Sequence, residues 1–140
     1  MADEMNVFTY GSLMFPAVWQ QVVRGDYRSS TASIQGFRRV CVRDGNYPAL
    51  IIAPRAAPIV GRLYFAVSAA DVARLDYFET RNYERVLVAA TVNSVATAAQ
   101  AYLAASIDLL TDTDWNETTF EQSGLPVFLT TYVVKNNPPT

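Results

Sequence analysis

The sequence contains no histidine, and this absence excludes whole classes of active site. A Ser-His-Asp triad, a Cys-His pair and an imidazole metal site all require that residue. The single cysteine, Cys41, cannot form a disulfide within the chain, and with so few thiols a structural zinc is excluded too. Acid–base chemistry must therefore come from aspartate, glutamate, tyrosine or the one lysine, Lys135, which lies in a polar tail and is a poor candidate.

Other features are missing as well. There is no run of about 18 apolar residues, so no membrane span is expected. Basic blocks interleaved with aromatic residues are also missing, which argues against a nucleic-acid surface. The acidic residues 1–5 lack the pattern of a secretory signal, and together with the lone thiol they suggest a reducing, cytoplasmic location.

What is present predicts one folded domain. The chain has 140 residues, of which 51% are hydrophobic and 17% charged, with a net charge of −2. This length suffices for one core but not for two ordinary domains. We place the domain at residues 6–134 and expect residues 1–5 and 135–140 to be loose termini.

Alternating apolar residues and turn signals predict five to seven strands with two or three short helices. So many strands in 140 residues favour an α+β fold, with a mixed, strongly curved sheet or small open barrel and helices at its mouth. Residues 25–33 are expected to form a loop or short edge strand, and residues 94–96 a turn. The expected strands are residues 6–10, 36–43, 47–53, 59–67, 84–93 and 98–104, with a last strand or extended segment at 125–134.

Three further features concern local structure. Pro16 opens a helical pattern. Another helix is expected to begin near residues 112–117 with an Asp or Thr as its N-cap, and to end at Gly124. Gly61, inside a strong strand, indicates a bulge or a close approach of backbones. Cys41 is interpreted as a structural thiol, since no base lies near it in the sequence.

The helix expected at residues 68–78 carries the main candidate for catalysis. Ser68 followed by Asp71 predicts a capping box, and the apolar residues 72, 75 and 78 share one face. Glu79 lies beside that face, where desolvation would raise its pKa and make it a proton acceptor near neutral pH. The alternative is an exposed glutamate, or one paired with Arg81 or Arg85.

A second candidate is the turn at Gly11-Ser12, between the first strand and the first helix. Backbone N–H groups of such a turn favour a carboxylate or a phosphate. Most Gly-Ser pairs, however, are ordinary turns, so the pair alone does not distinguish a binding loop from a simple connection.

Several motifs in order resemble the gamma-glutamylcyclotransferase-like superfamily, which includes AIG2-like and gamma-glutamylamine cyclotransferase-like proteins. Residues 10–13 (Tyr-Gly-Ser-Leu) resemble its opening motif, and residues 47–49 and 60–64 look like its central strands. Residues 75–79 and 83–86 are similar to its Leu-Asp-x-x-Glu and Tyr-x-Arg signature. The resemblance covers roughly residues 6–105, and the segment after Ser106 matches nothing in the family pattern.

The resemblance implies a compact, barrel-like α+β fold and a cofactor-independent cyclisation of a γ-glutamyl amide to 5-oxoproline. Glu79 would be the catalytic carboxylate, and a backbone N–H or the hydroxyl of Tyr83 or Tyr102 would stabilise the oxyanion. The substrate's α-carboxylate would be bound by the loop of Tyr10, Gly11, Ser12 and Leu13.

One position departs from the family: many members have glycine directly after the glutamate, where this chain has Thr80. Tyr10, Tyr83 and Arg85 also have a purely structural interpretation as packing residues, with Arg85 paired to an acid.

Two other functions stay open. One is a non-catalytic ligand-binding or regulatory module with the same pocket, and the other is a different acyl transfer, such as removal of a γ-glutamyl protecting group. The group attached to the γ-glutamyl moiety and the oligomeric state cannot be derived from the sequence.

Overall fold

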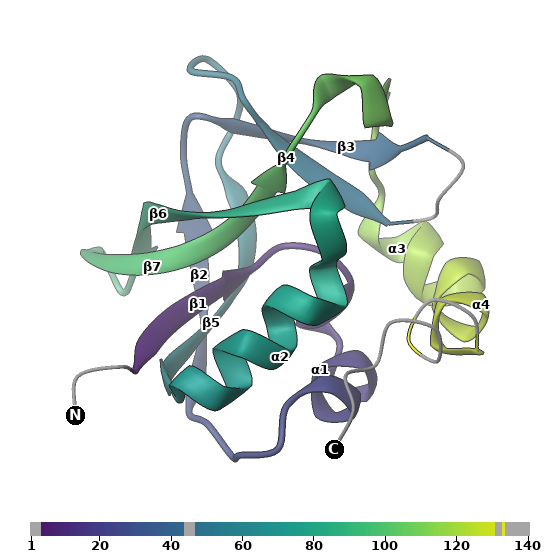
Figure 1. Ribbon diagram of the computed structural model, residues 1–140. Coiled ribbons are helices and arrows are strands. Elements are labelled where there is room, and N and C mark those ends of the chain that lie inside the picture. Colours follow the sequence, from purple (N-terminus) through teal and green to yellow (C-terminus); the bar gives the residue numbers. More distant parts are fainter. Residues whose placement is uncertain (1–3, 44–46, 131–132, 134–140) are drawn as a thin grey trace.

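The computed structural model describes residues 4–43, 47–130 and 133. Eight strands form one mixed sheet, and α-helices and short 3₁₀ turns lie beside it (Figure 1). The strands are β1 (Met5–Thr9), β2 (Ser29–Ile34), β3 (Phe37–Val42), β4 (Pro48–Ile52), β5 (Ile59–Val67), β6 (Tyr83–Val92), β7 (Val95–Ala104) and β8 (Leu110–Asp114). The α-helices are α1 (Pro16–Val22), α2 (Ala69–Glu79), α3 (Glu117–Thr119) and α4 (Leu125–Thr130).

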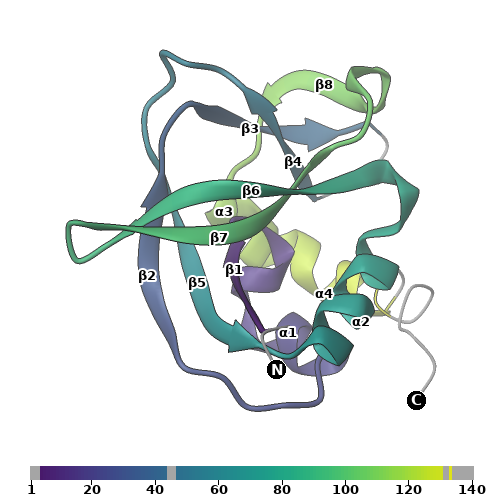
Figure 2. The same cartoon turned by 60° about the vertical axis from the view of Figure 1, so that its left-hand side comes forward.

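Five of the strands close into a barrel (Figure 2). β1 pairs with β5, β5 with β2, β2 with β6 and β6 with β7, and each of these pairs is antiparallel. A parallel pairing between Val7 of β1 and Gln100 of β7 completes the ring. The expected α+β fold with a strongly curved mixed sheet or small barrel is therefore confirmed.

The barrel closes tightly where β5 passes β1. A Cβ atom added at Gly61 would lie 2.1 Å from the backbone oxygen of Thr9 and 2.8 Å from the ring of Phe8. No side chain fits into that distance, so glycine is required by the close approach of the two backbones. The expectation from the sequence is confirmed at this position.

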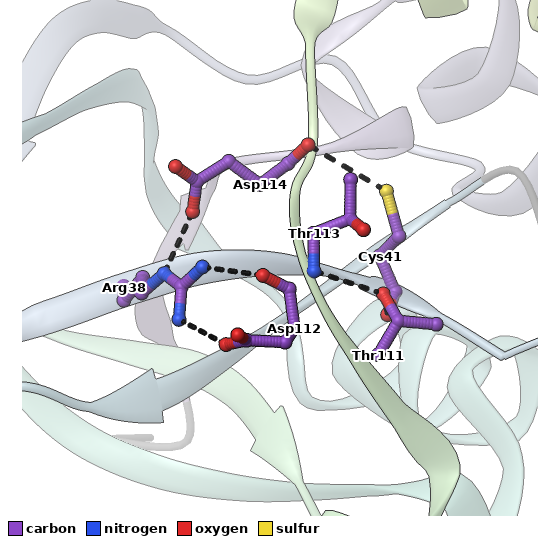
Figure 3. A network of polar contacts seen from close by, with 6 residues as sticks. All are labelled: Arg38, Cys41, Thr111, Asp112, Thr113 and Asp114. Carbon is purple, nitrogen blue, oxygen red and sulfur yellow. Dashed lines mark hydrogen bonds and ion pairs between the residues drawn. The ribbon is translucent and has the colours of Figure 1, made fainter.

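The remaining strands extend the sheet beyond the barrel. β4 adds to β7 in parallel, β3 pairs with β4, and β8 pairs with β3 at the outer edge. Arg38 of β3 holds β8 in place (Figure 3). Its guanidinium donates to Asp112 at 3.0 Å and to Asp114 at 2.7 Å.

The helices share one core with the outer side of β1 and β5, whereas a separate cluster from all five barrel strands fills the inside of the barrel. Buried residues of α1 and α2 pack on this outer side with aromatic residues from the C-terminal segment. The face of α2 is the predicted one, since Val72, Leu75 and Phe78 are all buried. This packing fixes the orientation of α2, whose last residue is Glu79.

The C-terminal segment was predicted wrongly. Residues 110–114 are the strand β8, so the helix begins later, with Asn116 as the N-cap of α3. Gly124 does not end a helix, because a π-helical turn over Phe120–Gly124 runs directly into α4. Leu125–Thr130 is therefore helical and not extended, and of the rest of the predicted segment 125–134 only residue 133 is described.

Smaller corrections concern the N-terminal half and the hairpin. Met5 belongs to β1 and is paired with Val67, so it is not part of a loose leader. The segment 25–33 contains the start of β2, which lies between β5 and β6 and is not an edge strand. The turn between β6 and β7 is Asn93-Ser94, where both residues have positive φ, as a tight hairpin turn requires. The predicted tail at 135–140 lies outside the described residues.

Candidate functional site

The start of α2 is fixed by Ser68 and Asp71. Ser68 is the N-cap, and its hydroxyl accepts a hydrogen bond from the backbone N–H of Asp71. The carboxylate of Asp71 does not reach back to Ser68 as a full capping box would require. It accepts hydrogen bonds from the N–H groups of Arg24 and Gly25, just after α1.

Asp71 is thus the link between two helices. Its carboxylate also accepts from the Tyr27 hydroxyl at 2.6 Å and pairs with Arg74 at 2.7 Å. Burial alone would raise the pKa of Asp71, but these hydrogen bonds to its ionised form outweigh burial and lower the pKa below 3.8. The charged carboxylate therefore holds α2 against the end of α1.

Glu79 lies at the opposite end of α2, next to the buried Phe78. Burial, and to a smaller extent the nearby charge of Asp76, together raise the pKa of Glu79 to about 8. Among the described residues, no hydrogen bond or ion pair reaches the Glu79 carboxylate, and Arg85 pairs with Asp76 at 3.0 Å instead. The alternative of a Glu79 paired with Arg81 or Arg85 is therefore not observed, and the partly buried side chain of Glu79 lies between the expected desolvated group and an exposed one.

Asp76, one helical turn before Glu79, binds side chains of β6 and β7. One of its oxygens, Oδ1, accepts a hydrogen bond from the Tyr102 hydroxyl at 2.6 Å and another from Arg85. Burial and this hydrogen bond raise the pKa of Tyr102, so its hydroxyl keeps its proton. Asp76 therefore joins β6 and β7 to α2, one helical turn before Glu79.

We expect Asp76→Asn to lower the pKa of Glu79 from about 8, because the variant removes a neighbouring negative charge. The pKa should remain above the ordinary value of 4.5, since burial is the larger cause of the shift. NMR titration of the Glu79 side-chain carboxyl carbon measures it directly. Asp108→Asn, at an exposed position, is the control. An unchanged pKa of Glu79 in Asp76→Asn would show that the two carboxylates are not coupled.

The loop after β1 is the second part of the site. Gly11 has φ −135° and ψ −129° and precedes a 3₁₀ turn over Ser12–Met14. A Cβ atom at Gly11 would lie 2.5 Å from the Pro48 ring, so glycine lets the loop approach β4 closely. Arg39 supports the same loop from outside: it donates to the backbone oxygen of Tyr10 at 2.7 Å, and its guanidinium lies over the Trp115 ring.

One pocket contains both parts of the site. The empty space between its lining atoms is about 380 Å³ when open solvent at the mouth is counted. The structure places every site residue predicted from the sequence in its lining: Tyr10, Gly11, Ser12, Leu13, Glu79, Tyr83 and Tyr102. Their shared location was not visible in the sequence, since these residues come from four different elements or loops. Their individual roles stay proposals.

Sequence reasoning missed other residues of the lining. Tyr47, Pro48 and Phe78 were assigned to a strand and a core face without a part in the pocket. Phe128 of α4 was placed in a wrongly predicted strand, and no motif pointed to it. A spacing signal did exist, because Phe120 and Phe128 are two turns apart on a helix, but the β-branched residues nearby concealed it.

Two of the tyrosine hydroxyls are already engaged. Tyr83 donates to the backbone oxygen of Pro48 at 2.8 Å, and Tyr102 donates to Asp76. A hydroxyl has one proton, so neither can donate to a substrate oxyanion in this arrangement. Tyr83 and Tyr102 are thus disfavoured as oxyanion donors, which favours the alternative of a backbone N–H. The third hydroxyl, of Tyr10, donates to the backbone oxygen of Tyr102.

Thr80 has a backbone conformation that suits glycine. Its φ is 66° and its ψ −169°, a region that is essentially restricted to glycine. Many members of the superfamily that the sequence resembles have a glycine directly after the glutamate, and this backbone conformation gives a physical reason for it. The strain lies directly beside Glu79, at the end of α2.

Thr80→Gly is expected to raise the free energy of unfolding by about 1 kcal/mol. Relief of the strained backbone contributes about 1–3 kcal/mol, and the greater freedom of glycine in the unfolded chain offsets about 0.5–1 kcal/mol of that. Chemical denaturation measures the difference. Thr97→Gly, in the ordinary strand β7, is the matched control and should destabilise the protein. A loss of stability in Thr80→Gly would contradict the strain.

Metal and thiol chemistry find little support. Within residues 4–43, 47–130 and 133, no three side chains of Asp, Glu or Cys are grouped so that they could hold a metal ion. Cys41 is partly buried, and burial raises the pKa of its thiol, which favours the interpretation as a structural residue.

Comparison with known proteins identifies the family. The family model described as gamma-glutamyl cyclotransferase, AIG2-like, matches residues 7–117. The match covers most of the chain, and the protein belongs to this family. It runs from within β1 to the end of β8, includes the predicted site loop and ends before α4.

The individual relatives are distant. Protein AIG2 C from Arabidopsis thaliana is 31% identical over 83 residues, which are 59% of this chain and 50% of that protein. The chain spans about half the length of the curated relatives it matches. A solution structure from Arabidopsis thaliana is 25% identical with a TM-score of 0.68, and the match covers 98% of this chain and 96% of that one.

A crystal structure of an AIG2-like protein from Mus musculus has a TM-score of 0.64 at 18% identity, covering 81% of this chain and 86% of that one. At this identity the likeness supports the fold. None of the helices in the described part of the chain is long and apolar enough to cross a membrane.

Proposed function

We propose that this protein cyclises a γ-glutamyl amide to 5-oxoproline and releases an amine, with Glu79 as general acid and base. The observation that carries the proposal is the carboxyl group of Glu79, which lies in the pocket with its pKa raised to about 8. Such a group exists in both protonation states near neutral pH, so it can accept a proton and return it. Membership of the family supports the class of reaction.

The chemistry needs few groups from the protein. The α-amine nitrogen of the substrate attacks the side-chain amide carbon, and a new C–N bond closes a five-membered ring. Glu79 takes the proton that the amine loses. The bond to the leaving nitrogen then breaks, and Glu79 returns the proton to that nitrogen. No water is consumed, and because the attack is intramolecular, positioning supplies much of the rate.

Positioning is assigned to the loop of Gly11, Ser12 and Leu13. Its backbone N–H groups would bind the α-carboxylate or the oxyanion, since the hydroxyls of Tyr83 and Tyr102 donate elsewhere.

The test is to incubate the purified protein with a set of γ-glutamyl amides and to measure 5-oxoproline by liquid chromatography. N-acetyl-γ-glutamyl amides are matched controls, because their blocked α-amine cannot attack. Product only from substrates with a free amine supports the proposal. Free glutamate in place of 5-oxoproline would indicate a different acyl transfer. Binding measured by calorimetry without any product would indicate a ligand-binding or regulatory module instead.

A further inference from the structure

One arginine reaches the loop of the pocket from outside the pocket. Arg39 of β3 is not part of the lining, and its Nη1 donates a hydrogen bond to the backbone oxygen of Tyr10 at 2.7 Å. The guanidinium lies 4.9 Å from the centre of the Trp115 ring, and the backbone N–H of Trp115 donates to the backbone oxygen of Arg39 at 3.2 Å. These contacts hold the side chain of Arg39 against the loop that follows β1.

The positive charge of Arg39 is not neutralised by an ion pair. None of the ion pairs between described residues includes it. Burial lowers the pKa of Arg39, while the negative charges of Glu117 and Asp114 act in the opposite direction. A guanidinium keeps its proton in proteins. Arg39 is therefore a half-buried cation whose hydrogen bond to the loop goes to the carbonyl of Tyr10.

The loop itself has backbone donors without acceptors. The N–H groups of Gly11, Ser12 and Leu13 find no acceptor among the described residues, although all three residues are buried. A buried N–H without a partner costs about as much free energy as a lost hydrogen bond. All three residues line the pocket that contains Glu79. Their N–H groups are therefore available to an anion that enters this pocket.

The carbonyl that Arg39 contacts and the N–H of Gly11 belong to the same peptide group. In a trans peptide group the C=O and the N–H point in opposite directions. Arg39 therefore binds one side of the group, and the N–H on the other side is left for a ligand. A cation on the carbonyl oxygen draws electron density from the nitrogen through the amide resonance, which makes the N–H a stronger donor.

We propose that Arg39 is a positioning residue for the α-carboxylate of the substrate and acts through the peptide group of Tyr10 and Gly11. This inference rests on the proposed function. The described residues that line the pocket include no arginine or lysine, so ionised Glu79 would repel a carboxylate there without compensation. Arg39 supplies the compensating positive charge from behind the loop and strengthens the Gly11 N–H, without touching the substrate.

The test compares two substrates that differ only in the α-carboxylate. One is a γ-glutamyl amide, and the other is the 4-aminobutanoyl amide of the same amine, whose own amine attacks its amide carbon to give pyrrolidin-2-one. Arg39→Met keeps a side chain of similar length over Trp115 but removes the charge. It should reduce the kcat/KM ratio of the first substrate to the second by about 10-fold, the usual effect of losing a hydrogen bond to a charged group.

Two further variants locate the effect. Arg39→Lys keeps a positive charge and a donor, so it should restore most of the ratio. Arg38→Met is the matched control, because the neighbouring guanidinium binds Asp112 and Asp114 of β8 and not the loop. It should leave the ratio unchanged. A ratio unchanged in Arg39→Met, or an equal loss for both substrates, would overturn the inference, since a merely structural role affects both alike.

Binding of the two lactams gives a readout without turnover. 5-Oxoproline and pyrrolidin-2-one also differ by one carboxylate, and NMR titration measures their dissociation constants together with the chemical shift of the Gly11 amide proton. The wild type should bind 5-oxoproline about 10-fold more tightly or better, and Arg39→Met should remove most of this preference. Only 5-oxoproline should move the Gly11 amide proton downfield. This shift tests the inference in the wild type should Arg39→Met fail to fold, and its absence would overturn it.

The two proposals can fail separately. If no amide yields 5-oxoproline but the binding preference for 5-oxoproline depends on Arg39, the cyclisation fails and the role of Arg39 stands. If 5-oxoproline forms and both preferences are the same in Arg39→Met and the wild type, the reverse holds. If nothing binds and nothing reacts, both are wrong.

Discussion

Replacing Glu79 with glutamine is expected to lower kcat/KM for γ-glutamyl amides by about 10²–10⁴-fold, the usual contribution of one general acid–base group. Glutamine fits the same space beside Phe78, but its amide cannot accept a proton from the substrate amine. The 5-oxoproline assay at saturating and limiting substrate measures the loss. Glu84→Gln, at an exposed position on β6, is the matched control and should keep wild-type activity.

The pH dependence follows from the pKa of Glu79. The base must be ionised, so kcat/KM of the wild type should rise with pH and reach its inflection near 8. In the substrate complex the ammonium group would favour the ionised carboxylate, so the inflection of kcat should lie lower. Asp76→Asn should move the kcat/KM inflection to lower pH as well. A wild-type profile that is flat between pH 6 and 9 would contradict the role of Glu79.

The melting temperature of Glu79→Gln distinguishes a loss of catalysis from misfolding of the variant. The folded-state pKa of Glu79 is raised from 4.5 to about 8, so the protonated form favours folding. This contribution is fully present below pH 4.5 and is lost as the pH rises through about 8. Glutamine cannot ionise, so the variant should melt at the same temperature as the wild type, or at a higher one, above pH 8. A lower melting temperature there would point to misfolding.

Removing the carboxylate of Asp71 is expected to cost about 3–5 kcal/mol of stability, the usual effect of breaking a buried ion pair. Asp71 is 2% exposed and accepts hydrogen bonds from Arg24, just after α1, and from Arg74 of α2. Asp71→Ala leaves the N–H groups of Arg24 and Gly25 without this acceptor. Chemical denaturation followed by circular dichroism measures the loss.

The contribution of Asp71 to the free energy of unfolding should depend on pH in the opposite sense to the contribution of Glu79. Because the folded-state pKa of Asp71 is lowered below 3.8, its stabilising contribution is present above that pH and is lost as the pH falls through the folded-state value. The difference in the free energy of unfolding between Asp71→Ala and the wild type should therefore become smaller in strong acid. Asp26→Ala, an exposed neighbour with the same change of charge, should cost no more than about 0.5 kcal/mol. Equal losses in the two variants would contradict the anchoring role of Asp71.

The helix that carries Glu79 illustrates what local patterns can predict. Ser68 as N-cap and the spacing of Val72, Leu75 and Phe78 are short-range signals, and the structure has the cap and the buried face as expected. The same holds for β5, whose bounds match the predicted strand at residues 59–67, with Gly61 at a close approach. Both elements are specified by residues within a few positions of one another.

The C-terminal segment shows where local patterns fail. Val127 and its neighbours favour a strand by propensity, yet residues 125–130 are helical. The helix is stabilised by the burial of Phe128 against Phe78, Tyr47 and Phe120, and two of these partners, Phe78 and Tyr47, come from elements far from α4 in the sequence. Tertiary packing therefore overrides the local preference.

The sequence by itself determined the α+β class, the strands up to residue 104 except β2, the helix that precedes Glu79 and the resemblance that singled out residues 10–13. These depend on periodicity, capping and turn residues, all of which act over a few positions. Only the tertiary structure decided the order of the strands, the closing contact between β1 and β7, the partners of Asp71 and Asp76, and the contact of Arg39 with the backbone of Tyr10. Burial sets the pKa of Glu79, and burial is a property of the folded chain as a whole.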